Sequence, residues 1–151
     1  MRIAVTGATG YIGGRLIPRL LDEGHAVVCL ARNPAKLDTD PWREQVDVRQ
    51  ADVTDLDSLQ TALEGCDAAY YLVHSMGDGP SFAEADRRAA ANFAQAAADN
   101  GVGRIVYLGG LGDSDEDLSP HLSSRHEVGE VLAGGPTPVT ELRAAIVIGS
   151  G

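Results

Sequence analysis

The chain has 151 residues, of which 44% are hydrophobic and 23% are charged, and these proportions are ordinary for a water-soluble globular protein. Its formal net charge of -10 argues against nucleic acid or an anionic membrane as the main partner. The length predicts one domain with enough chain to bury a core.

The cysteines and the first apolar run indicate the class of protein. Neither Cys29 nor Cys66 has the spacing of a metal ligand set, so we expect no metal site and a reduced, cytoplasmic setting. Thr6 and Gly7 interrupt the first apolar run, which therefore does not resemble a secretory signal peptide. No apolar stretch approaches the roughly 18 residues that a membrane-spanning helix needs.

Short apolar runs and segments with helical spacing alternate along the chain. In chain order the predicted elements are a strand at Arg2–Thr6, a helix at Tyr11–Glu23, strands at Ala26–Ala31 and Val46–Ala51, a helix at Asp55–Leu63, a strand at Ala68–Val73, a helix at Phe82–Asn100, a strand at Arg104–Leu108, a helix at Ser119–Leu132 and a strand at Glu141–Ile148. Strands separated by helices of this length imply parallel pairing through right-handed crossovers. We predict an α/β Rossmann fold, a doubly wound parallel sheet with strand order 3-2-1-4-5-6 and helices on both faces.

Particular residues predict the ends of these helices. Gly24 stops the first helix as a glycine C-cap does, and Asn100 with Gly101 closes the long alanine-rich helix. Thr54 is expected to cap the second helix. We expect the alanine-rich helix to pack closely on the sheet and to turn Asn92 toward the active site.

The junction between the first strand and the first helix is the most specific feature of the chain. Gly7, Gly10 and Gly13 form a G-x-x-G-x-x-G turn at this junction. Gly7 is expected to make the tight turn, Gly10 to let the backbone approach a pyrophosphate, and Gly13 to let the helix pack on the strand. A glycine triplet at a strand-to-helix junction therefore predicts a dinucleotide site, with the pyrophosphate at the helix N-terminus.

The last predicted strand ends close to Gly149, near the end of the chain. In an open parallel sheet, ligands bind outside the carboxyl ends of the strands. We therefore expect residues 1–151 to form the NAD(P)-binding domain of a longer protein, with the C-terminal substrate-binding segment absent. A minimal binding domain is the alternative.

Several stretches resemble the short-chain dehydrogenase/reductase superfamily, in its atypical and extended, NmrA-like branch. The resemblance rests on Thr6-Gly7-Ala8-Thr9-Gly10-Tyr11-Ile12-Gly13, Ala31-Arg32-Asn33-Pro34, Ala51-Asp52-Val53, Tyr70-Tyr71-Leu72-Val73-His74-Ser75-Met76-Gly77 and Arg104-Ile105-Val106-Tyr107-Leu108. It covers nearly the whole chain. It implies an NAD(P)-binding protein, with an oxidoreductase or a dehydratase/epimerase as the activity.

The resemblance and the residues together give the candidate cofactor site. Arg32 follows the second strand where an acidic residue would hold a ribose 2′-hydroxyl, and an arginine there pairs with a 2′-phosphate, so NADP is preferred over NAD. The alternative for Arg32 is a solvated residue at a helix start. The cofactor-binding candidates are Gly7, Thr9, Gly10, Tyr11, Ile12, Gly13, Arg32, Asp52, Val53, Val73 and His74. The resemblance implies that Asp52 and its neighbour lie beside the adenine, and that Val73 and His74 pass the ribose and nicotinamide.

The catalytic residues depart from the pattern of the superfamily, which is a Tyr-x-x-x-Lys pair on the helix after the fifth strand. His121 stands in the place of the tyrosine and Arg125 in the place of the lysine. Glycine also replaces the serine expected near the end of the fifth strand. The spacing of four puts both side chains on one helix face, and histidine can exchange protons near neutral pH, so they are the candidate catalytic pair.

Two functions stay open at this point. One is the nucleotide-binding part of an NADP-dependent oxidoreductase or dehydratase/epimerase, acting on a small carbonyl or quinone-like substrate. The other is a non-catalytic dinucleotide sensor of NmrA type that regulates a protein partner, which the altered catalytic residues favour. The substrate and the oligomeric state, including a homo-oligomer, are left open by the sequence.

Overall fold

The computed structural model describes residues 1–74, 80–111, 119–145 and 147–149. The last two residues of the chain and part of the stretch 70–77 quoted above lie outside these ranges. Within them, no helix combines the length and the apolar character that crossing a membrane requires.

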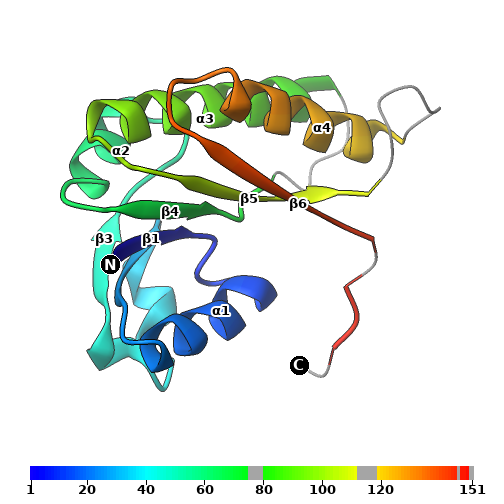
Figure 1. Ribbon diagram of the computed structural model, residues 1–151. Helices are drawn as coiled ribbons and strands as arrows, with labels where there is room; N and C mark the ends of the chain where they lie inside the picture. The colour runs from blue at the N-terminus through cyan, green and yellow to red at the C-terminus, as the bar shows by residue number, and fades with distance from the viewer. Residues whose placement is uncertain (75–79, 112–118, 146, 150–151) are drawn as a thin grey trace.

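Six parallel strands form one sheet in the order β3-β2-β1-β4-β5-β6, which confirms the predicted Rossmann topology (Figure 1). The strands are β1 (Arg2–Thr6), β2 (Ala26–Ala31), β3 (Asp47–Gln50), β4 (Ala68–Tyr71), β5 (Ile105–Gly110) and β6 (Val139–Ala144). The helices are α1 (Tyr11–Asp22), α2 (Leu56–Ala62), α3 (Pro80–Asp99) and α4 (Pro120–Ala133), with two 3-10 turns, η1 (Pro34–Leu37) and η2 (Arg43–Gln45).

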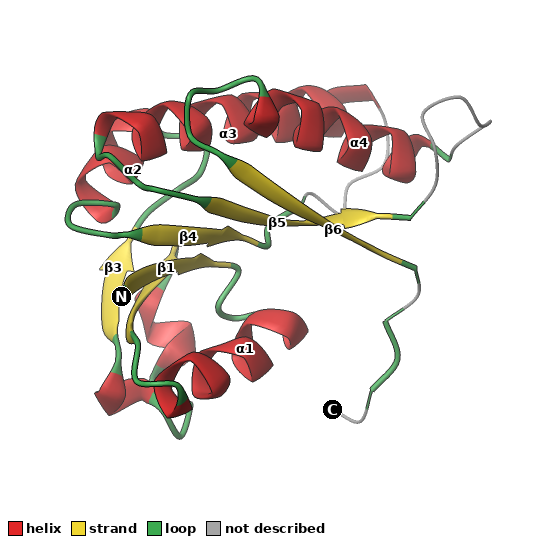
Figure 2. Ribbon diagram, viewed as in Figure 1, coloured by secondary structure: helices red, strands yellow, loops and turns green. Residues whose placement is uncertain are grey.

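Helices cover both faces of the sheet, as predicted (Figure 2). On one face α1 and the two 3-10 turns bury residues such as Ile17, Leu37 and Trp42 against β1 and β2. On the other face α2, α3 and α4 bury a larger cluster around Tyr71 and Phe93, whose rings meet edge to face at 4.9 Å. The alanines of α3 let this helix lie close to the sheet, since Ala90, Ala96 and Ala97 are fully buried.

The C-terminal strand lies earlier in the chain than the apolar run suggested. Its register with β5 pairs Ile105 with Val139 and Gly110 with Ala144. Because β5 ends at Gly110, the residues after Ala144 pass beyond the end of the neighbouring strand. Val147 and Ile148 are accordingly 51% and 90% exposed rather than part of the predicted strand.

One local prediction was also wrong, and one feature was not predicted. The N-cap of α2 is Asp55, whose carboxylate accepts hydrogen bonds from the backbone N–H groups of Asp57 and Ser58, and not Thr54. The crossover from β2 to β3 contains η1 and η2, which the sequence did not predict, since segments of three or four residues carry too little periodicity. Gly24 and Gly101 have the positive φ angles of helix-terminating glycines, as expected.

Candidate functional site

The turn between β1 and α1 is shaped by two of its three glycines. Gly7 has a φ of 71°, and a Cβ there would lie 3.0 Å from the carbonyl oxygen of Leu72. A Cβ at Gly13 would collide with the backbone of Gly7 and Ala8, so only glycine lets α1 begin this close to the turn. The tight turn predicted at Gly7 and the need for a glycine at Gly13 match this geometry, although a Cβ at Gly13 would meet the turn and not the strand.

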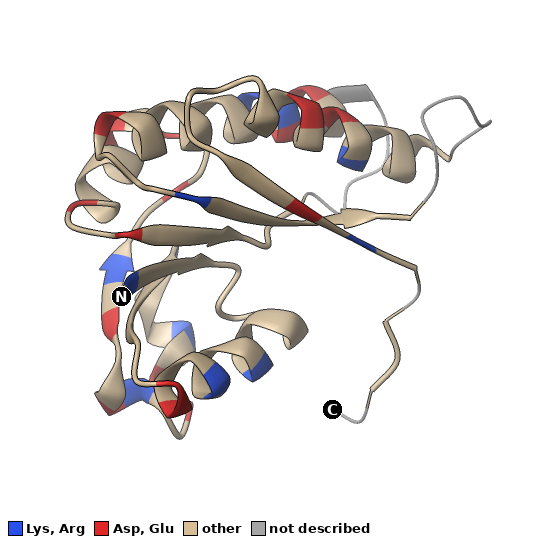
Figure 3. Cartoon of the chain, in the orientation of Figure 1, with Lys and Arg blue, Asp and Glu red and all other residues tan. Residues whose placement is uncertain are grey.

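The N-terminus of α1 is open to an anion. Gly10 is its N-cap, and among the described residues no side chain makes a capping hydrogen bond there, whereas Asp55 caps α2 and Ser119 caps α4. The first turn of α1 also carries no acidic residue (Figure 3). The first N–H groups of a helix have no intrahelical partner and sit at the positive end of its dipole. This turn therefore fits the pyrophosphate of a dinucleotide.

A groove of about 420 Å³ runs from this turn along the carboxyl ends of β1, β2 and β4. Five of the predicted cofactor-binding residues line it together: Gly7, Thr9, Arg32, Val53 and Val73. Gly10 and Gly13 shape the adjoining turn without lining the groove. The side-chain amide of Asn92 donates a hydrogen bond to the carbonyl oxygen of Val53 at 3.3 Å. Asn92 therefore turns toward the candidate cofactor groove and contacts its wall at Val53.

Lys36 is a groove residue that the sequence reasoning missed. It lies on η1 and lines the same groove as Arg32 and Asn33, and both cations are exposed. The side chain of Asn33 accepts a hydrogen bond from the backbone N–H of Ala35, which starts the 3-10 turn that carries Lys36. A lysine four residues after the predicted arginine was the available signal, but without the 3-10 turn its direction could not be inferred.

Asp52 lines a second hollow of about 390 Å³. Arg32 and Ala51 line both this hollow and the groove. Its carboxylate accepts hydrogen bonds from the backbone N–H of Thr54 at 2.9 Å and from the Thr54 hydroxyl at 2.7 Å. These two bonds hold the pKa of Asp52 below its usual value, with a smaller contribution from the positive charge of Arg32. An ionised carboxylate at this place can accept a hydrogen bond from an amine.

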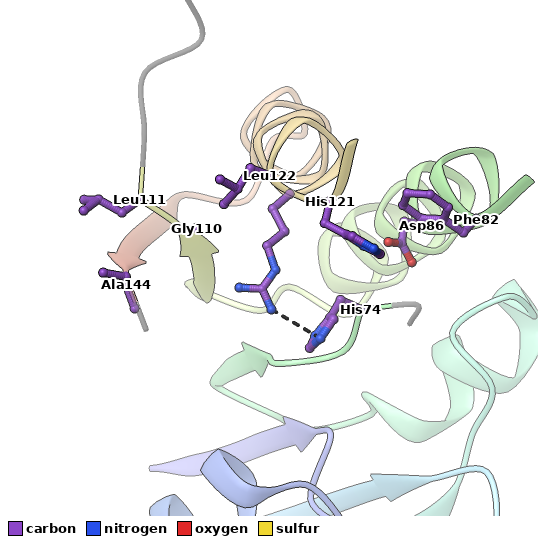
Figure 4. Close-up of a pocket in the computed structure, with 10 residues that line it drawn as sticks. His74, Phe82, Asp86, Gly110, Leu111, His121, Leu122 and Ala144 are labelled. Atoms are coloured by element: carbon purple, nitrogen blue, oxygen red, sulfur yellow. Dashed lines mark hydrogen bonds between the residues drawn. The ribbon is translucent and has the colours of Figure 1, made fainter. Parts of the chain in front are cut away.

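A large cavity, of about 780 Å³, lies between α3, α4 and the carboxyl ends of β5 and β6 (Figure 4). Both candidate catalytic residues, His121 and Arg125, line it, and so does His74 from the end of β4. The structure thus brings His74 together with the pair His121 and Arg125, which lies much later in the sequence. The remaining walls come from Phe82, Asp86, Gly110, Leu111, Leu122, Ala144 and Ala145.

Arg125 and His74 contact each other across this cavity. Their Nη2 and Nε2 atoms are 3.3 Å apart (Figure 4). A guanidinium only donates, so Nε2 of His74 accepts and the imidazole is neutral, with its proton on Nδ1. Partial burial lowers the pKa of His74, and the positive charge of Arg125 lowers it further, while Asp86 acts in the opposite direction.

His121 stacks on Phe82, with ring centroids 5.1 Å apart and an interplanar angle of 29°. Phe82 lies one turn before Asp86 on α3, and the buried carboxylate of Asp86 accepts a hydrogen bond from the Ser124 hydroxyl at 3.3 Å. The sequence reasoning missed Phe82, Asp86 and Ser124. Their role depends on the packing of α3 against α4, which no spacing within either helix shows.

Tyr107 does not offer an alternative proton donor. Its hydroxyl donates a hydrogen bond to the backbone carbonyl oxygen of Arg125 at 2.8 Å, beneath the cavity. Burial raises the pKa of Tyr107 to about 12. The tyrosine therefore stays protonated and supports the backbone of α4.

A third hollow of about 360 Å³ connects the turn with the large cavity. Tyr11 and Ile12 from the start of α1 line it together with His74 and Arg125. Since His74 and Arg125 line both this hollow and the large cavity, a ligand lying on the glycine turn can extend to the cavity between α3 and α4.

Comparison with known proteins agrees with this geometry. The sequence model of NAD(P)H-binding proteins matches residues 7–141. The triphenylmethane reductase of Citrobacter sp. has 30% sequence identity and a TM-score of 0.82, over 97% of this chain and 50% of that one. The NADPH-dependent quinone oxidoreductase of Escherichia coli, solved with NADPH, has 32% identity and a TM-score of 0.77, over 93% and 48% of the two chains.

Among curated proteins, cinnamoyl-CoA reductase 1 of Oryza sativa subsp. japonica is 32% identical over 116 residues, which cover 73% of this chain and 34% of the plant protein. The chain therefore spans about half of the two reductase structures and about a third of this curated relative.

Proposed function

The chain belongs to the NAD(P)H-binding family, as a Rossmann domain of the atypical, NmrA-like short-chain dehydrogenase/reductases, and on this premise we propose that it is the cofactor-binding part of an NADP-dependent oxidoreductase. The substrate is a small carbonyl or quinone-like compound held in the cavity between α3 and α4. Related reductases that act with NADPH or NADP(H) support this choice of reaction and cofactor.

One observation carries the proposal: the His74–Arg125 pair forms a wall shared by the hollow beside the glycine turn and the large, mostly apolar cavity. A dinucleotide whose pyrophosphate lies at Gly10 would extend past Tyr11 and Ile12 toward this pair. Arg32 and Lys36 at the other end of the groove would hold a 2′-phosphate, and Asp52 would accept a hydrogen bond from the adenine amine.

When bound, a reduced nicotinamide supplies a hydride to the carbonyl carbon of the substrate. The chain has to supply a proton to the carbonyl oxygen. His121 is the residue that donates it, because its imidazole lines the cavity and histidine exchanges protons near neutral pH. Arg125 donates a hydrogen bond to the same oxygen and stabilises its developing negative charge, while the neutral His74 holds the guanidinium in place.

The second candidate function is a dinucleotide sensor that binds the cofactor without using it and regulates a protein partner. The residues that favour it are Gly109 and Gly110 at the end of β5, where the superfamily pattern has a serine. A sensor needs the groove but does not need His121. The buried free thiols of Cys29 and Cys66 support a reducing, cytoplasmic setting for either function.

Titrating the purified chain with NADPH and NADH tests the part that both functions share, and we expect NADPH to bind more tightly. If neither dinucleotide binds, both functions are excluded. Oxidation of NADPH in the presence of carbonyl and quinone compounds then separates them. Binding with no turnover of any compound would favour the sensor.

His121→Phe tests the proton donor. The substitution keeps an aromatic ring against Phe82 but removes both ring nitrogens. We expect kcat to fall about 100-fold with NADPH affinity unchanged, which is the usual contribution of general acid catalysis. An unchanged kcat would remove His121 from the mechanism.

A further inference from the structure

Two stacked rings join the first turns of α3 and α4. Phe82 lies in the first turn of α3 and His121 in the first turn of α4. Their ring centroids are 5.1 Å apart and their planes differ by 29°. This separation falls in the range of about 4.5–7 Å that aromatic pairs prefer. Both residues line the large cavity, and Figure 4 shows them at the same end of it.

The contact with Phe82 limits the orientation of the His121 side chain. His121 is exposed, and among the residues that the structure describes its imidazole makes no hydrogen bond. His74, in contrast, is held by the guanidinium of Arg125 at 3.3 Å. An exposed side chain without a polar partner exchanges rapidly between rotamers. The stacked phenyl ring therefore decides how the imidazole of His121 lies in the cavity.

Other contacts fix the backbone of α4 against α3. The hydroxyl of Ser124 donates a hydrogen bond to the carboxylate of Asp86 at 3.3 Å, and Arg87 forms an ion pair with Glu127 at 3.0 Å. Both contacts lie farther along the two helices than the stacked pair. Removing the phenyl ring should consequently free the imidazole without moving the helix that carries it.

Stacking holds the imidazole by its face and leaves its edge open. The two ring nitrogens of His121 lie at this edge, whereas Phe82 contacts the face. A hydrogen-bonding neighbour would occupy one of the nitrogens, as Arg125 does at His74. With both nitrogens available, one can donate a proton into the cavity and the ring can regain a proton from water.

We propose that Phe82 is the positioning residue for His121. Its ring keeps the edge of the imidazole directed into the cavity, and so takes the place of the carboxylate that orients the histidine in other catalytic sites. The inference rests on the proposed function for the use of the proton. The position of the imidazole is a property of the chain without any ligand.

Nuclear magnetic resonance of the ring protons tests this position directly. The resonances of His121 are identified by their loss in His121→Phe and are followed at mildly alkaline pH, so that protonation does not contribute. We expect Phe82→Leu to move them toward the values of a histidine in an unfolded peptide, because the ring current of the phenyl group is lost. Phe82→Tyr keeps a ring and should leave them in place. Unmoved resonances in Phe82→Leu would overturn the inference.

Phe93→Leu is the matched control, since it makes the same substitution on the same helix. Phe93 is fully buried, and its ring meets Tyr71 edge to face at 4.9 Å. We expect Phe93→Leu to lower the melting temperature more than Phe82→Leu does, and to leave the His121 resonances unchanged. Equal movement of these resonances in both variants would assign the effect to helix packing and contradict the role of Phe82.

Turnover shows whether Phe82 acts through His121. With a compound that the chain reduces, Phe82→Leu should lower kcat about tenfold, which is part of the roughly 100-fold expected for His121→Phe, since a proton donor that is poorly oriented works less well. In the His121→Phe background, Phe82→Leu should cause no further loss, because the residue to be positioned is gone. An equal loss in both backgrounds would mean that Phe82 acts on the substrate itself, and would reject the inference.

The two proposals fail in different ways. If neither NADPH nor NADH binds, or no compound is reduced, the proposed function is rejected, while the ring-proton resonances still decide the position of the imidazole. If Phe82→Leu does not fold, as circular dichroism would show, a nuclear Overhauser effect between the ring protons of Phe82 and His121 in the unsubstituted chain decides it. Absence of that effect contradicts the inference.

Discussion

The groove at the glycine turn and the cavity between α3 and α4 are made from different parts of the chain. The groove depends on the backbone of one turn, in which Gly7 has a positive φ and Gly13 leaves no room for a Cβ. The cavity depends on side chains that come from the end of β4, from α3 and from α4, such as His74, Asp86 and His121.

From this difference we expect the groove and the cavity to tolerate substitutions differently. A backbone site is specified by few residues that have no substitutes, because the conformation itself is the binding group. A side-chain site can exchange one donor or acceptor for another on the same scaffold, which is the role we propose for His121 and Arg125 in place of a tyrosine and a lysine. The fold and cofactor of such a family therefore stay constant while its chemistry varies.

Disturbing the backbone of the glycine turn should have the largest effect on NADPH affinity. Gly13→Val places a Cβ against the backbone of Gly7 and Ala8, which cannot move aside without opening the turn. We expect NADPH affinity to fall roughly 100-fold and the free energy of unfolding to fall by about 1–3 kcal/mol, as for other overpacked sites. Fluorescence titration with NADPH and urea denaturation measure the two effects.

Gly14 provides the matched control for this prediction. It is the next residue of the same helix, and a Cβ built on it meets nothing within 4 Å. Gly14→Ala should leave NADPH affinity unchanged and stabilise the chain by about 0.5–1 kcal/mol, since alanine costs less backbone entropy in a helix. Loss of NADPH binding in both variants would show that the turn is sensitive to any change, and not to the collision at Gly13.

Removing a side chain from the groove should have a smaller and more selective effect. Arg32→Ala should weaken NADPH about 10- to 100-fold and NADH by about twofold or less, because only NADPH carries the 2′-phosphate. Lys36→Ala should act in the same direction but more weakly, since an ammonium cannot pair with phosphate bidentately. Titrating each variant with both cofactors measures the ratio.

Arg19→Ala serves as the control, because Arg19 lies in the last turn of α1, away from the groove. It removes the same charge from an acidic chain without removing a groove residue. Equal losses for NADPH and NADH in Arg32→Ala would refute the 2′-phosphate role and would leave Arg32 as a solvated residue at the start of η1.

The hydroxyl of Tyr107 beneath the cavity should contribute to the free energy of unfolding and not to the rate of catalysis. Tyr107→Phe removes the hydrogen bond to the carbonyl oxygen of Arg125 at 2.8 Å and keeps the buried ring. We expect the free energy of unfolding to fall by about 1 kcal/mol. Any turnover that the chain supports should change by a factor of about two or three. Tyr70→Phe on β4 is the control for removing a tyrosine hydroxyl. If Tyr107→Phe lowered kcat as much as His121→Phe does, Tyr107 would be a proton donor.

The contrast between the groove and the cavity also explains which features could be predicted from the sequence. The strand order, the alternation of elements and the roles of Gly7 and Gly13 follow from local patterns, because β–α–β units and glycine turns are specified by neighbours in the chain. The position of β6 was not predictable from its apolar run. It depends on its pairing with β5, whose end at Gly110 decides where the strand stops.

The residues of the cavity were only partly predictable from the sequence, because they come together from separate elements of the chain. His74, His121 and Arg125 stood out by their places at strand ends and on one helix face, and the structure brings them together. Asp86, Phe82 and Lys36 were missed because nothing near them in the sequence marks their direction. Asp86 looks like one more charge on a helix until Ser124 of α4 is seen to donate a hydrogen bond to it.

The smallest effect we expect is a pH dependence of stability that originates at His74. Partial burial and the positive charge of Arg125 lower its pKa in the folded chain, with His121 adding to them and Asp86 opposing them. Below the ordinary histidine value of 6.5 the unfolded chain therefore binds a proton before the folded chain does. Stability is complete above that pH and is lost as the pH falls through the lower, folded pKa.

Thermal unfolding followed from neutral to mildly acidic pH should show this loss. His74→Gln should remove part of it, because glutamine keeps an acceptor for Arg125 but does not titrate. His25→Gln, a substitution in the turn between α1 and β2, should leave the pH dependence of the melting temperature unchanged. Since carboxylates that titrate at lower pH also contribute to acid unfolding, only the difference between the two variants is assigned to His74. An identical pH dependence in both would mean that the pKa of His74 does not differ between the folded and the unfolded chain.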